Sequence, residues 1–142
     1  MKILKIHTLE KGWWDKDHIM LHAVFQLLSD FMEQEKPDKI VDWSFDSKHK
    51  HAWKEIRSLY RWWTRVRPTR KDPLDDKNLK KPPIRWKKIS RSDNRKLVDY
   101  DKKIFAEYDA ALKKHFQLER KWEKEDQRNL HRLIEIREFL WT

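Results

Sequence analysis

Two residue types are scarce in this sequence of 142 residues: cysteine is absent, and glycine occurs once, at Gly12. Without cysteine the chain can form neither a disulfide nor a thiolate metal site, and it has no cysteine nucleophile. A single glycine cannot build a glycine-rich phosphate loop or the GxSxG turn of the α/β-hydrolases. Any phosphate binding would therefore have to use arginine and lysine side chains or a helix N-terminus.

Long apolar runs are absent as well. No stretch reaches the roughly 18–20 apolar residues that cross a bilayer, and residues 1–9 are too short and too charged for a signal peptide. We therefore expect a cytoplasmic protein with no membrane partner. Although 41% of the residues are charged, 13% are aromatic and nine are tryptophan. These large apolar side chains favour a folded chain over a disordered one.

The scarcity of glycine also disfavours β architectures rich in hairpins, because tight hairpins use glycine or asparagine at positive φ. We predict an all-α fold, with residues 1–142 forming a single domain built as a bundle of three or four helices. Apolar residues at spacings of three and four predict helices at about 15–35 and 48–67, which end near Pro37 and Pro68.

The last part of the chain, residues 93–141, contains neither glycine nor proline and predicts a long C-terminal helix. It forms either one rod of roughly 70 Å or two helices broken near 115–120. Residues 68–92 hold four of the five prolines and many lysines and arginines, which predicts a long basic loop. The long helix could also pair with a second copy, giving a homodimer.

The net charge of +10 is confined to the middle of the chain. Residues 1–60 contain ten Lys/Arg and ten Asp/Glu, and residues 97–142 contain ten of each. Residues 61–96 contain fourteen basic residues and four acidic ones. This distribution is typical of a surface that faces a polyanion.

Tryptophans occur within residues 61–96, which we call the basic segment. Cations beside exposed indoles can bind phosphates and stacked bases. We interpret the segment as a site for nucleic acid, a nucleotide ligand or an acidic protein surface. In the alternative interpretation, Trp62 is half-buried and the lysines only solvate a loop. The candidate anion-binding residues are Arg57, Arg61, Trp62, Arg65, Arg67, Arg70, Lys80, Lys81, Arg85, Trp86, Lys87 and Lys88.

Polar residues on the apolar helix stripes indicate a second hypothesis, in which imidazoles and carboxylates from facing helices hold a divalent metal. Such a site, with Mg or Mn, would support an all-α nucleotide phosphohydrolase. The HExxH pattern is absent, and polar residues on such stripes more often have a structural role. We therefore expect no cofactor. The candidate metal ligands are His18, His22, Asp30, Glu33, Glu55 and Asp126.

Three blocks of the sequence resemble a family of small uncharacterised proteins of tailed bacteriophages: WWDKDHIMLHAVFQLLSDFMEQEK, EIRSLYRWWTRVRPTRKDP and WEKEDQRNLHRLIEIREFLWT. The resemblance implies a phage protein made in the bacterial host cytoplasm, and it carries over no functional residue. With the charge distribution, it leads us to expect a non-enzymatic accessory protein that binds an anionic partner, in counter-defence or host takeover. The alternatives are the phosphohydrolase and a pure protein–protein inhibitor of a host enzyme.

Overall fold

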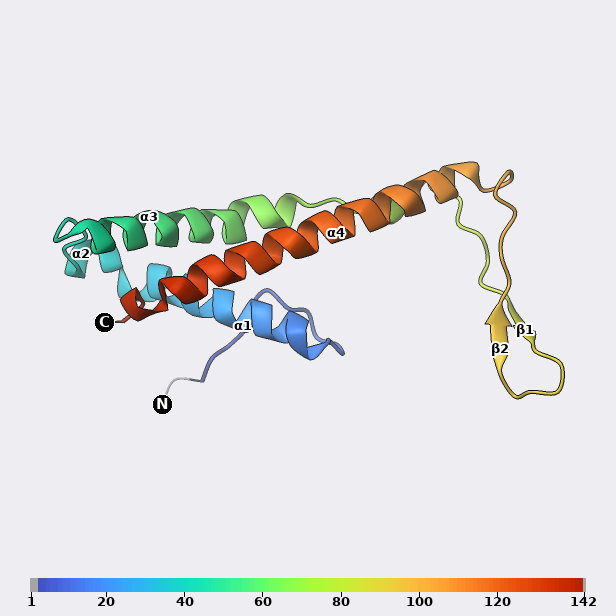
Figure 1. The fold of residues 1–142 in the computed structure, drawn as a ribbon, viewed down its shortest axis with the longest axis horizontal. Helices are drawn as coiled ribbons and strands as arrows, with labels where there is room; N and C mark the ends of the chain where they lie inside the picture. The colour runs from blue at the N-terminus through green and yellow to red at the C-terminus, as the bar shows by residue number, and fades with distance from the viewer. Residues whose placement is uncertain (1–2, 142) are drawn as a thin grey trace. The chain divides into compact units, whose positions relative to one another are not determined.

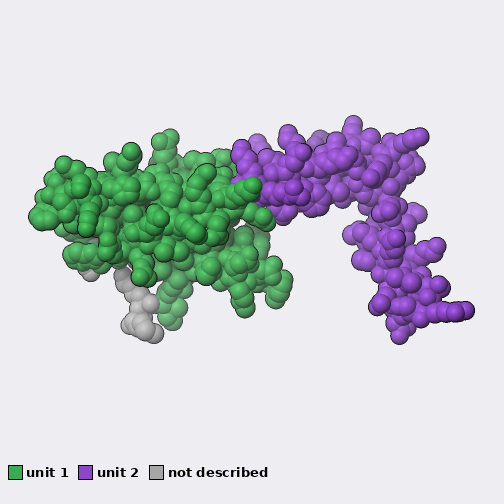
Figure 2. Space-filling model, in the orientation of Figure 1, with its two compact units in different colours: residues 1–70, 123–142 green, residues 71–122 purple. Residues whose placement is uncertain are grey.

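The structure, a computed structural model, describes residues 3–141 and is mostly helical (Figure 1). Within these residues there are four α-helices and one two-stranded antiparallel sheet. The sheet corrects the prediction of an all-α fold. The chain also divides into two compact units where one domain was predicted (Figure 2). Unit 1 comprises residues 1–70 and 123–142, and unit 2 comprises residues 71–122.

Three helical segments pack side by side in unit 1 (Figure 1). They are α1 (Lys16–Asp30), α3 (Ser47–Arg61) and the C-terminal part of α4 (Ala106–Glu135), and the short helix α2 (Pro37–Ile40) lies between α1 and α3 in the chain. Each segment buries apolar residues spaced three or four apart, as amphipathic helices do. The buried rows are Leu21, Phe25 and Leu28 of α1, Ala52, Ile56 and Leu59 of α3, and Leu130 and Leu133 of α4 with Ile136 after it.

Local signals set the ends of α1 and α3. Asp15 occupies the N-cap position of α1, and a π-helical turn extends this helix to Glu35, before Lys36 adopts a left-handed φ of 51°. Asp46 caps α3 by accepting a hydrogen bond from the His49 backbone N–H at 2.7 Å. A π-helical turn then carries the helix to Val66, shortly before Pro68, which cannot continue it.

Unit 2 contains the sheet. The strands β1 (Trp86–Lys88) and β2 (Arg95–Leu97) form an antiparallel hairpin whose loop spans residues 89–94. The backbone N–H of Ile89 donates to the carbonyl of Asn94 at 3.1 Å, and the N–H of Val98 donates to the carbonyl of Arg85 at 2.8 Å. We call residues 85–98 the basic hairpin.

Helix α4 begins at Ala106 and not at residue 93, which corrects the predicted start. Residues 95–97 pair as a strand, and Asp101 then accepts the backbone N–H of Lys103 at 2.8 Å in a turn before the helix. The helix is continuous through 115–120 and ends at Glu135. Of the two predicted forms, a single rod or two helices broken near 115–120, the structure has the single rod. None of the helices in residues 3–141 combines the length and apolar character needed to cross a lipid bilayer.

Candidate functional site

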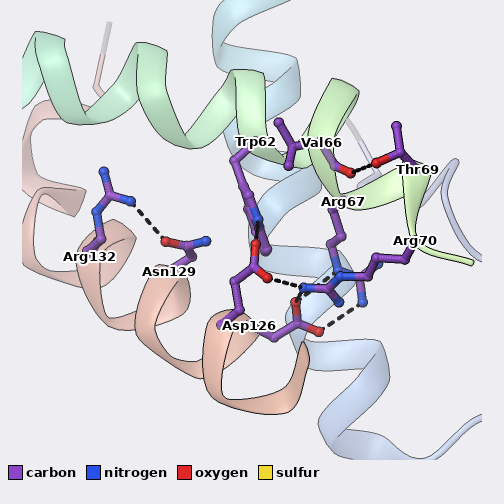
Figure 3. A network of polar contacts seen from close by, with 9 residues as sticks. Trp62, Val66, Arg67, Thr69, Arg70, Asp126, Asn129 and Arg132 are labelled. Atoms are coloured by element: carbon purple, nitrogen blue, oxygen red, sulfur yellow. Dashed lines mark hydrogen bonds and ion pairs between the residues drawn. The ribbon is translucent and has the colours of Figure 1, made fainter. Parts of the chain in front are cut away.

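Some cations of the basic segment are neutralised inside unit 1 (Figure 3). Nε and one terminal nitrogen of Arg67 donate to the two carboxylate oxygens of Asp126 at 3.1 and 3.0 Å. Arg70 donates to the same carboxylate at 2.8 Å and lies 3.5 Å from Glu125. The indole N–H of Trp62 donates to the other oxygen of Glu125. This network holds the end of the α3 segment against α4.

The electrostatics of Asp126 reflect these contacts. Burial acts to raise the pKa of the carboxyl, but the hydrogen bonds and charges of Arg67 and Arg70 outweigh it, so the pKa lies below its ordinary value. The two guanidinium groups also lie over indole rings, Arg67 at 4.8 Å from the Trp63 ring centre and Arg70 at 5.8 Å from that of Trp62.

These contacts correct part of the predicted anion site. Trp62 is only 8% exposed, so it cannot stack on a base from outside. Arg67 and Arg70 already have carboxylate partners, so their charge is balanced within the protein. These three residues therefore stabilise unit 1 and are removed from the candidate binding surface.

The predicted metal ligands are not gathered at one point. Among residues 3–141, no group of three or more histidine and acidic side chains is placed to hold a metal ion. Glu55 pairs with Arg132 at 2.7 Å, Glu33 accepts the hydroxyl of Tyr60, and Asp30 accepts the amide of Gln26. Asp126 is the counter-ion of Arg67 and Arg70. The hypothesis that these residues converge on a metal is therefore wrong for the described part of the chain.

The two histidines of that hypothesis belong to an aromatic stack. His18 lies between Trp14 and His22, with ring centres 5.0 and 4.6 Å away, and His22 meets Trp63 edge-on at 4.9 Å. Nδ1 of His22 lies 2.6 Å from the hydroxyl of Thr8. Nε2 of His22 is buried with no hydrogen-bond partner among the described residues.

Burial, together with the nearby charge of Arg67, lowers the pKa of His22 to about 4. This imidazole is therefore neutral at pH 7.

On the outer side of α3 a row of cations remains exposed. Arg57, Arg61 and Arg65 face solvent, and Arg57 lies over the Trp53 ring at 5.4 Å. A shallow groove of about 400 Å³ lies beside Arg57 and Arg61. Its lining comprises Lys54, Arg57, Ser58, Arg61, Trp62 and Val66.

The largest group of exposed cations lies in the basic hairpin of unit 2. Lys87 is paired with Lys96 across the two strands, and Lys88 with Arg95. Every residue of both strands is exposed, including Trp86 at 60%. The hairpin contains one acidic residue, Asp93. Its six basic residues are Arg85, Lys87, Lys88, Arg91, Arg95 and Lys96.

No carboxylate in residues 3–141 forms an ion pair with any of these six side chains. Lys80 and Lys81, which precede the hairpin, are also exposed, and Lys80 lies 5.4 Å from the ring centre of Phe105. The six cations of the basic hairpin are thus available to an external anion, in contrast to Arg67 and Arg70.

Sequence reasoning missed three members of this site, Arg91, Arg95 and Lys96. It placed Arg95 and Lys96 in a helix over 93–141, and it did not count Arg91 among the candidates of the 68–92 loop. A signal was present: the strand formers Trp86, Ile89 and Val98 flank a polar turn of serine, aspartate and asparagine. The two strands are only three residues long and contain charges at neighbouring positions, so their alternating pattern is weak.

Comparison with known proteins adds no relative. No protein-family model, curated protein or solved structure matches the chain.

Proposed function

We propose that this protein binds nucleic acid through the basic hairpin, as a binding protein and not as an enzyme. The proposal rests on one observation: the hairpin brings two like-charged pairs together, Lys87 with Lys96 and Lys88 with Arg95, with no internal counter-ion in the described residues. Like charges directly opposite each other destabilise a strand pair. A ligand that neutralises them therefore stabilises the hairpin as it binds.

The hairpin has little else to stabilise it. A two-stranded hairpin without a hydrophobic face packed on other elements is marginal in water. All six strand residues are exposed, so none of their side chains adds to a core. The basic hairpin is only marginally stable by itself, and both of its strands carry cations. An anionic partner that binds these cations therefore stabilises it.

A polymer of phosphates fits this surface better than a single nucleotide. Sites for small ligands are concave and bury most of the ligand. The strand residues of the basic hairpin are instead all exposed, and Lys80 and Lys81 extend the cationic surface along the chain. Unit 2 as a whole contains sixteen Lys/Arg and nine Asp/Glu, so its net charge favours a long polyanion.

The three blocks that resemble tailed-phage proteins support a role as a phage accessory protein in the bacterial host cytoplasm. Nucleic acid is abundant in that setting. We include this role in the proposal on the resemblance alone.

Fluorescence anisotropy tests the proposal. The full chain is titrated into labelled 20-mer duplex DNA, the same single strand and a duplex RNA of the same sequence, at 50, 100 and 200 mM salt. We expect binding that weakens about 10²-fold from 50 to 200 mM, as about four phosphate contacts require. The variant with alanine at Lys87, Lys88, Arg95 and Lys96 should lose most of this binding.

A control variant removes the same number of charges from unit 1, with alanine at the exposed residues Lys11, Lys16, Lys48 and Lys50. It should bind nearly as well as the wild type. If no nucleic acid shows salt-dependent binding, the proposed function is wrong and an acidic protein partner takes its place. If the hairpin variant binds nucleic acid as well as the control does, the basic hairpin is not the binding site.

A further inference from the structure

The two faces of the basic hairpin are both cationic. Residues paired across antiparallel strands point to the same side, and successive residues point to opposite sides. Lys88 and Arg95 therefore share one face with Trp86 and Leu97, whereas Lys87 and Lys96 share the other. We call these the Lys88 face and the Lys87 face.

A ribbon with cations on both faces fits between two anionic walls. On a flat phosphate surface, one face would be neutralised and the pair on the other face would still repel. In a groove of a duplex, both faces meet a phosphate backbone. Resting on the proposed function, we propose that the basic hairpin inserts into the major groove of double-stranded DNA.

The dimensions agree with this site. The major groove of B-DNA is about 12 Å wide and about 8.5 Å deep, and it admits a two-stranded β-ribbon. Strands of three residues, Trp86–Lys88 and Arg95–Leu97, extend about 10 Å. The ribbon is thus long enough to place its loop at the groove floor while its strand cations lie near the phosphates.

The hairpin loop carries side chains suited to base edges. Arg91 and Asn94 are exposed, and arginine and asparagine donate to guanine and adenine in the major groove. The loop has a defined shape, since the backbone N–H of Asn94 donates to the Ser92 hydroxyl oxygen at 2.9 Å and Arg91 adopts a left-handed φ of 64°. This order reduces the entropy that the loop loses on binding.

The other nucleic acids fit less well. The major groove of duplex RNA is deep and too narrow for side chains to read. Proteins that hold single strands stack successive bases on several aromatic side chains. Residues 85–98 contain one aromatic side chain, Trp86, so they offer no such platform.

The first test compares the two faces. Two double variants of the full chain, Lys87→Ala with Lys96→Ala and Lys88→Ala with Arg95→Ala, are titrated with the 20-mer duplex DNA. Each should weaken binding and reduce the slope of log affinity against log salt by about 2, as two lost phosphate contacts do. Both variants relieve a like-charge repulsion, so neither is expected to unfold the hairpin. Lys48→Ala with Lys50→Ala serves as the control with matched charge.

An effect confined to one face would overturn the inference, because the ribbon would then lie flat on the DNA. Equal or tighter binding of single-stranded DNA or duplex RNA would overturn it as well. Either result leaves the proposed function intact. Absence of binding to every nucleic acid would instead remove the proposed function itself.

Chemical protection identifies the groove directly. Dimethyl sulfate methylates N7 of guanine in the major groove and N3 of adenine in the minor groove. We expect the bound protein to protect guanine N7 and to leave adenine N3 reactive. Protection of adenine N3 alone would overturn the major-groove assignment.

Discussion

Lys87 lies directly opposite Lys96 in the antiparallel pair of β1 and β2, and the neighbouring pair, Lys88 with Arg95, is also of like charge. Arg67 and Arg70, from the same basic segment, share the carboxylate of Asp126. The segment therefore serves two purposes. Arg67 and Arg70 in its first part stabilise unit 1 through ion pairs, whereas the hairpin cations in its later part form no ion pair with a carboxylate of residues 3–141.

Reversing one charge of the Lys87–Lys96 pair separates hairpin stability from binding. Lys96→Glu places a carboxylate opposite Lys87, which replaces repulsion by attraction. We expect the variant hairpin to be better formed, with stronger cross-strand contacts between residues 87 and 96 in NMR spectra. Binding to duplex DNA should nevertheless weaken by about tenfold at 100 mM salt, because a phosphate contact is lost and a repulsion is gained. Tighter binding by the better-formed hairpin would contradict a phosphate-facing Lys96.

Limited trypsin digestion reports on the basic hairpin without any substitution. Trypsin cleaves after lysine and arginine, and Arg91 is exposed within the hairpin loop. We expect the earliest cuts within residues 85–96, because exposed backbone with few packed contacts opens most readily. Duplex DNA at saturating concentration should slow these cuts, while cuts at Lys48 and Lys50 keep their rate. Uniform protection of all sites, or of none, would argue against binding by the hairpin.

The role of Asp126 is tested by Asp126→Asn. This change leaves Arg67 and Arg70 without their shared counter-ion, and we expect the free energy of unfolding to fall by about 2 kcal/mol. That is less than the roughly 3–5 kcal/mol of a fully buried pair, because these side chains keep some contact with solvent. Chemical denaturation at pH 7 measures the difference. Glu123→Gln, at an exposed position of the same helix, is the control and should change stability little.

His22 makes the stability of unit 1 depend on pH. Its pKa is about 4 in the folded protein, whereas an unperturbed histidine has a pKa of 6.5, so the unfolded chain binds more protons between these values. The stability that depends on neutral His22 is complete above pH 6.5 and is lost as the pH falls towards 4.

After allowance for solvent screening, this loss is on the order of 2 kcal/mol. Thermal unfolding of the wild type and of His22→Gln at pH 8.0, 6.0 and 4.5 checks it. The melting temperatures should converge at low pH, because glutamine has no proton to bind. A constant difference between them at all three pH values would mean that His22 does not titrate in this range.

Patterns within short stretches of sequence were sufficient to predict part of the structure. The helices of unit 1 lie close to the predicted ranges 15–35 and 48–67, because the spacing of apolar residues such as Leu21, Phe25 and Leu28 is a property of one helix face. The absence of proline likewise predicted a long last helix, although not its start at Ala106. Net charge is additive along the chain, so its concentration in residues 61–96 follows from the sequence alone.

Only the tertiary structure decided which of these cations are available to an external anion. Asp126 lies 59 residues after Arg67, and no local sequence pattern predicts that so distant a carboxylate neutralises this arginine. The pairing of Lys87 with Lys96 had only a weak local signal, since a strand of three residues shows too little periodicity to distinguish it reliably from a loop. Composition determined that the chain carries an excess of positive charge. Folding determined which of these charges are balanced, because ion pairs and strand pairs form between residues that the fold brings together.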